Sequence, residues 1–203
     1  MMSFGVGLLG CAWLAVTVFF RVYRIWLPYY ILGSVGIAFW VILAGRELLA
    51  LDRLLAVQVA YCVDVLASWV GVPTRTFDRA PGVLMVLVIS QDVGWTMLQV
   101  GVESSGLLEI GVLTGLLSVY PGWSVQRRFT LIIIGVTLTM VANVLRVLVI
   151  VAMLHLLGKE ALLLAHTFVG KVIFFVFMVS IYWFLITRPT IQTVGATLRR
   201  STV

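Results

Sequence analysis

The chain has 203 residues, of which 62% are hydrophobic and 11% are charged, and its formal net charge is +6. A mean hydropathy of +1.15 argues against an ordinary soluble domain, and apolar runs of membrane-spanning length indicate an integral membrane protein. The basic residues are spread over loops and tails without forming a stripe, which argues against nucleic acid as a partner and for contact with membrane lipids.

The sequence predicts one all-α membrane domain, residues 1–203, built as a bundle of about six transmembrane helices. The first apolar run is followed by Arg21 and Arg24, not by a cleavage site, so we expect it to remain as a helix. The expected spans are 4–20, 25–44, 54–72, 105–121, 129–157 and 162–187, followed by a cytoplasmic tail, 188–203.

An even number of spans places both termini on one side of the membrane. That side then collects Arg46, Arg53, Arg127, Arg128, Arg188, Arg199 and Arg200. The positive-inside rule therefore predicts that both termini are cytoplasmic and that the opposite side carries Arg21, Arg24, Arg75, Arg79 and Lys159.

Residues 73–104 separate the third and fourth expected spans. Within them, "GVLMVLVISQDVGWTMLQVGVE" (82–103) has a first apolar run that is too short to cross about 30 Å of hydrocarbon, and "SQDVG" interrupts it with turn residues and a charge. We expect two short extended pieces here, forming a hairpin or a re-entrant flap on the extracytoplasmic face.

The stretch "VESSGLLEIGV" (102–112) places two serines where the fourth span begins. The simplest interpretation is that Ser104 or Ser105 caps the helix, because a serine oxygen accepts from amides left free in the first turn. Cys11 and Cys62 lie inside expected spans, without the spacing of a disulfide framework or a metal site. We therefore expect no metal and no cofactor.

Ionisable residues inside spans are costly and usually face a cavity or a partner. Arg146 lies about 25 Å from Phe129, near the outer leaflet, and Thr139, Asn143 and Arg146 form one polar stripe at i, i+4, i+7 spacing. The structural alternative is that Arg146 only pairs with a carboxylate such as Glu109. His166 lies about one turn into the last span, at the same outer depth as Ser104 and Arg146, whereas His155 points away from Arg146 on its own helix.

"ESSGLLEI", followed by "NVLR" and then "AHTFVG", resembles the exosortase/archaeosortase family of membrane transpeptidases, in particular its small subfamily from Gram-positive bacteria. The family core is a Cys-Ser-Gly-like motif, an Asn-x-x-Arg and a His-x-x-x-Gly on three successive helices. The resemblance covers about 100–175, and here Ser104 stands where the family has its nucleophilic cysteine.

The resemblance implies an enzyme that cleaves the C-terminal sorting signal of exported proteins at the outer face of the cell membrane and transfers them to a lipid or other amine acceptor. Residue 104 would be the nucleophile, with Arg146 and His166 catalytic and Asn143, Glu109 and Ser105 orienting the substrate. A serine hydroxyl needs a stronger base than a thiol, so the chain as written is expected to be inactive or slow. A deliberate exchange of cysteine for serine, a natural serine enzyme and a pseudoenzyme stay open as explanations.

Two other classes of function also stay open. A small transporter would line a polar path with Arg146, Lys171, Asp64 and Glu109, and it would keep its function when Ser104 is replaced. A non-catalytic scaffold would need neither Arg146 nor His166. Glycines at i, i+4 spacing, including Gly111 and Gly115, are expected to pack helices closely and not to take part in chemistry.

Overall fold

The computed structural model describes the chain except for residues 1–3, 78–84, 92–93, 101–103 and 194–203. Part of the expected flap and most of the expected tail therefore lie outside the described residues. The elements in chain order are α1 (Phe4–Val22), α2 (Trp26–Glu47), α3 (Leu51–Trp69), β1 (Thr74–Phe77), β2 (Met85–Gln91), β3 (Gly94–Val100), α4 (Leu107–Ser118), α5 (Val125–Leu157), η2 (Lys159–Ala161), η3 (Leu164–Val169), α6 (Gly170–Tyr182) and η4 (Trp183–Thr187).

Four helices are long and apolar enough to cross a membrane, judged by length and composition. They are Gly5–Val22, Trp26–Glu47, Val125–Leu157 and the continuous helical segment Lys159–Thr193, which contains α6. These helices are consistent with the expected helical membrane protein. The described residues also form a three-stranded antiparallel sheet, in which the expected hairpin supplies two strands and β1 is additional.

Two of the six expected spans do not have the properties of a membrane crossing. α3 is helical but includes Asp52, Arg53 and Asp64, so its charge content removes it from the candidate spans. α4 has only 12 residues, about 18 Å of helix, which is less than the hydrocarbon thickness. The hydropathy of the sequence therefore overestimated how apolar α3 is and how long α4 is.

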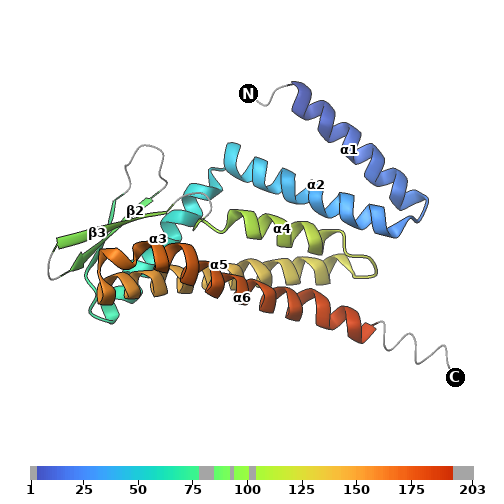
Figure 1. The fold of residues 1–203 in the computed structure, drawn as a ribbon. Coiled ribbons are helices and arrows are strands. Elements are labelled where there is room, and N and C mark those ends of the chain that lie inside the picture. Colours follow the sequence, from blue (N-terminus) through green and yellow to red (C-terminus); the bar gives the residue numbers. More distant parts are fainter. Residues whose placement is uncertain (1–3, 78–84, 92–93, 101–103, 194–203) are drawn as a thin grey trace.

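The helices α1, α2, α4, α5 and α6 run lengthwise, while α3 and the sheet lie together at one end of the bundle, here named the sheet end (Figure 1). Contacts fix this arrangement. At the sheet end, Gly45 near the C-terminus of α2 lies close to Leu51 of α3 and Leu107 of α4, because a methyl group added at Gly45 would contact both side chains. At the opposite end, Tyr120 stacks on Trp123 and meets Tyr30 edge to face.

The first and last helices can be oriented within the bundle by their contacts. α1 runs antiparallel to α2, because Gly10 meets Trp40 while Trp13 donates to the carbonyl of Leu32, so α1 begins at the sheet end. The last helix ends at the opposite end, where Thr190 bonds to Tyr120. The described chain therefore begins at the sheet end and ends at the opposite end of the bundle, while the side of a membrane on which each terminus lies stays a prediction.

The charges are divided between the two ends of the described chain. The end opposite the sheet carries five arginines, in the α1–α2 turn, at the start of α5 and near the end of the last helix: Arg21, Arg24, Arg127, Arg128 and Arg188. The described acids lie on α2 and α3, in the first turn of α4 and in η2: Glu47, Asp52, Asp64, Glu109 and Glu160. The sheet end also carries four described basic residues, Arg46, Arg53, Arg75 and Lys159, whereas Arg21 and Arg24 lie at the opposite end.

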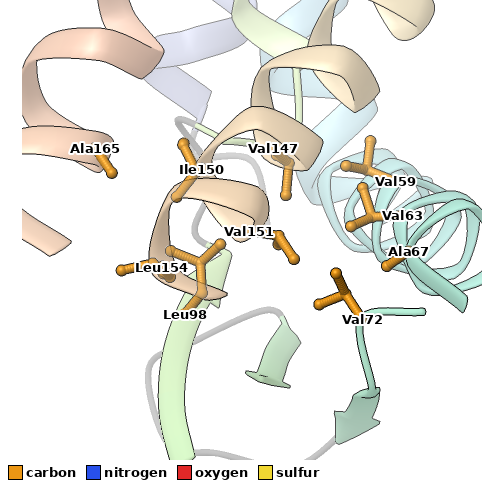
Figure 2. Packing of buried hydrophobic residues seen from close by; sticks show 10 residues of the cluster. All are labelled: Val59, Val63, Ala67, Val72, Leu98, Val147, Ile150, Val151, Leu154 and Ala165. Carbon is orange, nitrogen blue, oxygen red and sulfur yellow. The ribbon is translucent and has the colours of Figure 1, made fainter. Parts of the chain in front are cut away.

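The expected hairpin is present as β2 and β3, which pair antiparallel with Gln91 opposite Gly94. β1, which was not expected, pairs with β2. Leu98 of β3 and Val72 before β1 enter an apolar cluster in which Val147, Ile150, Val151 and Leu154 of α5 pack against Val59, Val63 and Ala67 of α3 and against Ala165 (Figure 2). Burial of these side chains holds α3 and the sheet against the second half of α5.

α4 is placed by close packing against α2. A methyl group added at Gly115 would lie 2.3 Å from the carbonyl oxygen of Ser34, and one at Gly111 would lie 2.4 Å from the side chain of Ile42. Glycine therefore lets the two backbones approach, as expected from the spacing. This contact fixes the height at which α4 begins, and with it the position of Ser104.

Candidate active site

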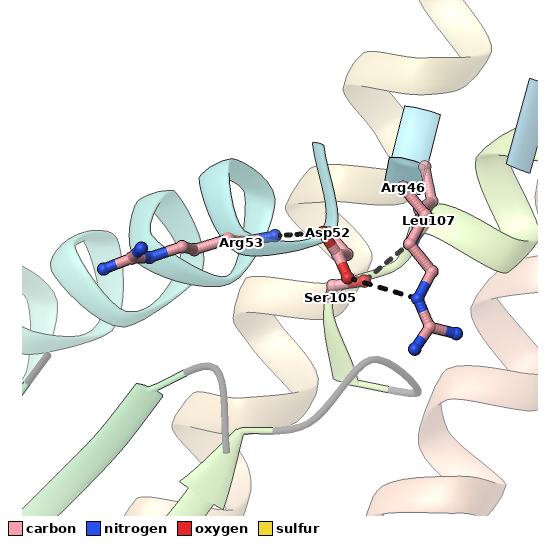
Figure 3. Close-up of polar contacts among 5 residues, drawn as sticks. All are labelled: Arg46, Asp52, Arg53, Ser105 and Leu107. Atoms are coloured by element: carbon pink, nitrogen blue, oxygen red, sulfur yellow. Dashed lines mark hydrogen bonds and ion pairs between the residues drawn. The ribbon is translucent and has the colours of Figure 1, made fainter. Parts of the chain in front are cut away.

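The turn before α4 has the geometry that the two serines and the glycine require. Gly106 has φ +81°, a conformation that residues with a Cβ rarely adopt. The Ser105 hydroxyl accepts a hydrogen bond at 3.2 Å from the N–H of Leu107, the first helical residue (Figure 3). The N-cap position itself is Gly106, which has no side chain to cap the helix, so Ser105 binds the first helical amide from one residue earlier and the Ser104 side chain makes other contacts.

Ser104 lies against α5. Its carbonyl oxygen accepts a 2.7 Å hydrogen bond from the Asn143 side-chain amide, and its hydroxyl accepts a 3.4 Å hydrogen bond from Nη2 of Arg146. Asn143 is fully buried, while Ser104 and Arg146 are each 6% exposed. Two residues one turn apart on α5 therefore hold the backbone and the side chain of residue 104.

The polar stripe expected on α5 is buried along its length. Thr139 and Asn143 are both fully inaccessible to solvent. Among the described residues, the Thr139 hydroxyl and the Oδ1 atom of Asn143 have no hydrogen-bond partner. Because a buried polar atom without a partner costs about 1–3 kcal/mol, Oδ1 is a candidate group for contacting the backbone of a bound peptide.

α6 contributes one aromatic side chain, Phe174, to this site. The Cζ atom of Arg146 lies 5.1 Å from the centroid of the Phe174 ring, within cation–π range. Phe174 is 8% exposed and belongs to an apolar cluster with Ala142 and Met178. The guanidinium is thus placed between the start of α4 and the side of α6. The motif-based reasoning did not select Phe174, although it follows His166 by eight residues.

His166 lies in η3, a π-helical turn, and its ring is half-buried. In a regular α-helix, eight residues at about 100° each would place His166 about 80° away from Phe174. A π turn has about 4.4 residues, or about 82° per residue. When the first four of the eight steps, from His166 to Gly170, take this value, the angle between His166 and Phe174 falls to about 10°. His166 therefore shares the Phe174 face, about 12 Å along the axis toward the sheet end.

The remaining expected site residues occupy separate places. Glu109 is half-buried in the first turn of α4, five residues after Ser104. Asp64 of α3 is half-buried and accepts a hydrogen bond from Thr74 at the start of β1. Lys171 is exposed on α6. The observed positions of Asp64 and Lys171 therefore do not form, together with Arg146, the polar path that a transporter would need.

No group of three or more His, Cys, Asp or Glu side chains able to hold a metal ion occurs among the described residues. Cys11 and Cys62 are free and exposed, on α1 and α3. Comparison with protein-family models, with curated proteins and with solved structures finds no significant match to this chain.

Proposed function

We propose that the protein is built as a membrane transpeptidase of the exosortase type, with residue 104 at the nucleophile position. The observation that carries the proposal is the buried contact of Ser104 with both Asn143 and Arg146 at the start of α4. A cation beside a nucleophile in a low-dielectric site stabilises the thiolate and, later, the oxyanion. With serine at position 104, the chain keeps this arrangement but lacks the readily ionised thiol.

The chemistry with cysteine at position 104 is a two-step acyl transfer. The thiolate attacks the carbonyl carbon of the scissile peptide bond, and Arg146 stabilises the negative oxygen of the tetrahedral intermediate. The C–N bond then breaks, and the leaving amine takes a proton from His166, which acted as general base for the thiol. An amine acceptor, such as a lipid headgroup, attacks the thioester, gives its proton to His166 and releases the thiolate.

The proposed substrate is an exported protein with a C-terminal sorting tail, and the site must therefore face outward. Twenty-one residues, about 32 Å of helix, separate Val125 from Arg146, which matches the thickness of the hydrocarbon core. The arginine-rich end lies on the Val125 side. By the positive-inside rule that end is cytoplasmic and the sheet end, with the site, is extracytoplasmic.

Cysteine labelling tests this orientation. Single cysteines replace Arg188 and Lys159 in a chain whose Cys11 and Cys62 have been changed to alanine, and intact cells are treated with a membrane-impermeant maleimide. We expect labelling of the Lys159→Cys variant alone, and labelling of the Arg188→Cys variant only after the cells are opened. The reverse pattern would place the site on the cytoplasmic face and would exclude an exported substrate.

The activity is tested by comparing the chain as written with its Ser104→Cys variant. Each is coexpressed with an exported reporter that carries a tail of a short polar motif, a transmembrane helix and a basic cluster. Intact mass spectrometry should detect a hydroxylamine-sensitive adduct on the introduced thiol, and this adduct should be lost in Ser104→Cys/Arg146→Ala and strongly reduced in Ser104→Cys/His166→Ala. A folded Ser104→Cys variant that forms no adduct and cleaves no tail would refute the transpeptidase and favour a scaffold.

A further inference from the structure

The position of the Arg146 guanidinium depends on contacts from two other elements. Nη2 reaches the Ser104 hydroxyl at 3.4 Å, which is near the upper limit for a hydrogen bond. The Phe174 ring faces the same guanidinium, with its centroid 5.1 Å from Cζ. A single long hydrogen bond is a weak restraint on a side chain with four rotatable bonds, so the aromatic face adds to what fixes its direction.

Phe174 is itself held rigidly. Its ring is 8% exposed and packs with Met178 and Ala142 in the cluster that joins α6 to α4 and α5. A buried aromatic ring in a close-packed cluster keeps one rotamer, so its negative face has a fixed direction. The described chain has two other cation–π pairs, Arg127 over Trp123 and Arg188 over Phe184, and both lie at the arginine-rich end.

We propose that Phe174 is a positioning residue that keeps the Arg146 guanidinium beside the side chain of residue 104. The proposal rests on the proposed function for its catalytic meaning, because a cation held at residue 104 stabilises the thiolate of the active form. The physical effect does not require a substrate. A leucine at position 174 fills much of the same space but lacks the ring quadrupole, so it would remove the aromatic restraint on the guanidinium.

The experiment measures ionisation of a thiol at position 104. Cys11 and Cys62 are changed to alanine and Ser104 to cysteine, and the thiolate is followed by its ultraviolet absorbance during a pH titration in detergent micelles. Subtraction of the matching Ser104→Ala protein removes the tyrosine signal. Absorbance needs no access of a reagent to the buried residue, so a signal is obtained for every folded variant.

In this background we expect Arg146→Ala to raise the pKa of the thiol, because an opposite charge beside it is lost. Phe174→Leu should move the pKa most of the way to the Arg146→Ala value, so that the thiolate fraction at neutral pH falls about three- to tenfold. Phe174→Tyr and Phe174→Trp keep an aromatic face and should retain the low pKa. Phe175→Leu is the matched control, because Phe175 is its neighbour in sequence but is 67% exposed.

A Phe174→Leu variant that titrates like its parent would overturn the proposal, and so would an unchanged pKa in Arg146→Ala. If Phe174→Leu does not fold, the tyrosine and tryptophan variants decide. Both keep an aromatic face at position 174, so a thiol pKa in these folded variants as high as that of Arg146→Ala would overturn the proposal. A positive titration combined with no adduct in the reporter assay would refute the transpeptidase while leaving the Phe174–Arg146 contact established. The two failures are therefore distinguishable.

Discussion

The buried stripe on α5 provides a direct comparison between a polar side chain that is bonded and one that is not. Asn143 donates a 2.7 Å hydrogen bond to the carbonyl of Ser104, whereas the hydroxyl of Thr139, one turn earlier, has no partner among the described residues. Both residues are fully buried on the same helix. Thr139→Val keeps the shape of the side chain, and Asn143→Leu keeps the number and branching of its heavy atoms, so neither substitution opens a cavity, although the two methyl groups of leucine are bulkier than the amide.

Asn143→Leu removes the donor and leaves the Ser104 carbonyl buried without it. A hydrogen bond between helices in a membrane is worth about 0.6 kcal/mol on average and up to about 1.7, and an orphaned buried carbonyl adds to that loss. We therefore expect a decrease of about 1–3 kcal/mol in the free energy of unfolding. Thr139→Val exchanges an unbonded hydroxyl for a methyl group, and we expect a change between zero and about 1 kcal/mol of stabilisation.

Reversible unfolding in mixed micelles of mild and denaturing detergent, followed by far-ultraviolet circular dichroism, measures both free energies. The matched pair controls for the general cost of changing a buried α5 residue. If Thr139→Val were as destabilising as Asn143→Leu, burial alone would explain the effect, and the hydrogen bond from Asn143 to Ser104 would have no special role. An Asn143→Leu variant of unchanged stability would lead to the same conclusion.

Two further substitutions test the packing of α4 and the ion pair at the sheet end. Gly115→Ala places a methyl group 2.3 Å from a backbone oxygen of α2 and should lower the unfolding free energy by about 1–3 kcal/mol, whereas Gly7→Ala, with nothing within 4 Å, should leave it unchanged in the same unfolding assay. Equal effects of the two would contradict the close approach. Arg46→Gln breaks a 3.9 Å pair between the 57% exposed Arg46 and Asp52, and its cost should stay below about 1 kcal/mol at any salt concentration.

The long apolar helices could be predicted because composition alone specifies them. α1, α2, α5 and the last helix each begin and end within about six residues of the expected limits. α3 and α4 were predicted as full spans but are not among the four helices long and apolar enough to cross a membrane. Hydropathy counts apolar residues without showing where a helix lies, and the buried residues of α3 pack against the second half of α5 and the sheet, not across the bundle.

The site was predictable only as far as helical periodicity holds. Thr139, Asn143 and Arg146 lie on one regular helix, and their shared burial follows from i, i+4, i+7 spacing. Phe174 could not be found in this way, because the π turn between His166 and Phe174 changes the angle between them by about 70°. Nothing in the sequence of that segment announces a π turn.

The direction in which α1 runs changes which charged residues lie together at each end of the bundle. Six spans placed Arg21 and Arg24 beside the acids of the opposite face, so the charge difference between the two sides was small. With α1 beginning at the sheet end, the arginines of the α1–α2 turn join those at the start of α5, and the described acids all lie in the other half of the molecule. Among the described loop residues, both arrangements place five basic side chains on one side and four on the other, so the positive-inside argument for an outward-facing site near residue 104 is equally strong in both, and the observed arrangement adds only the separation of the acids.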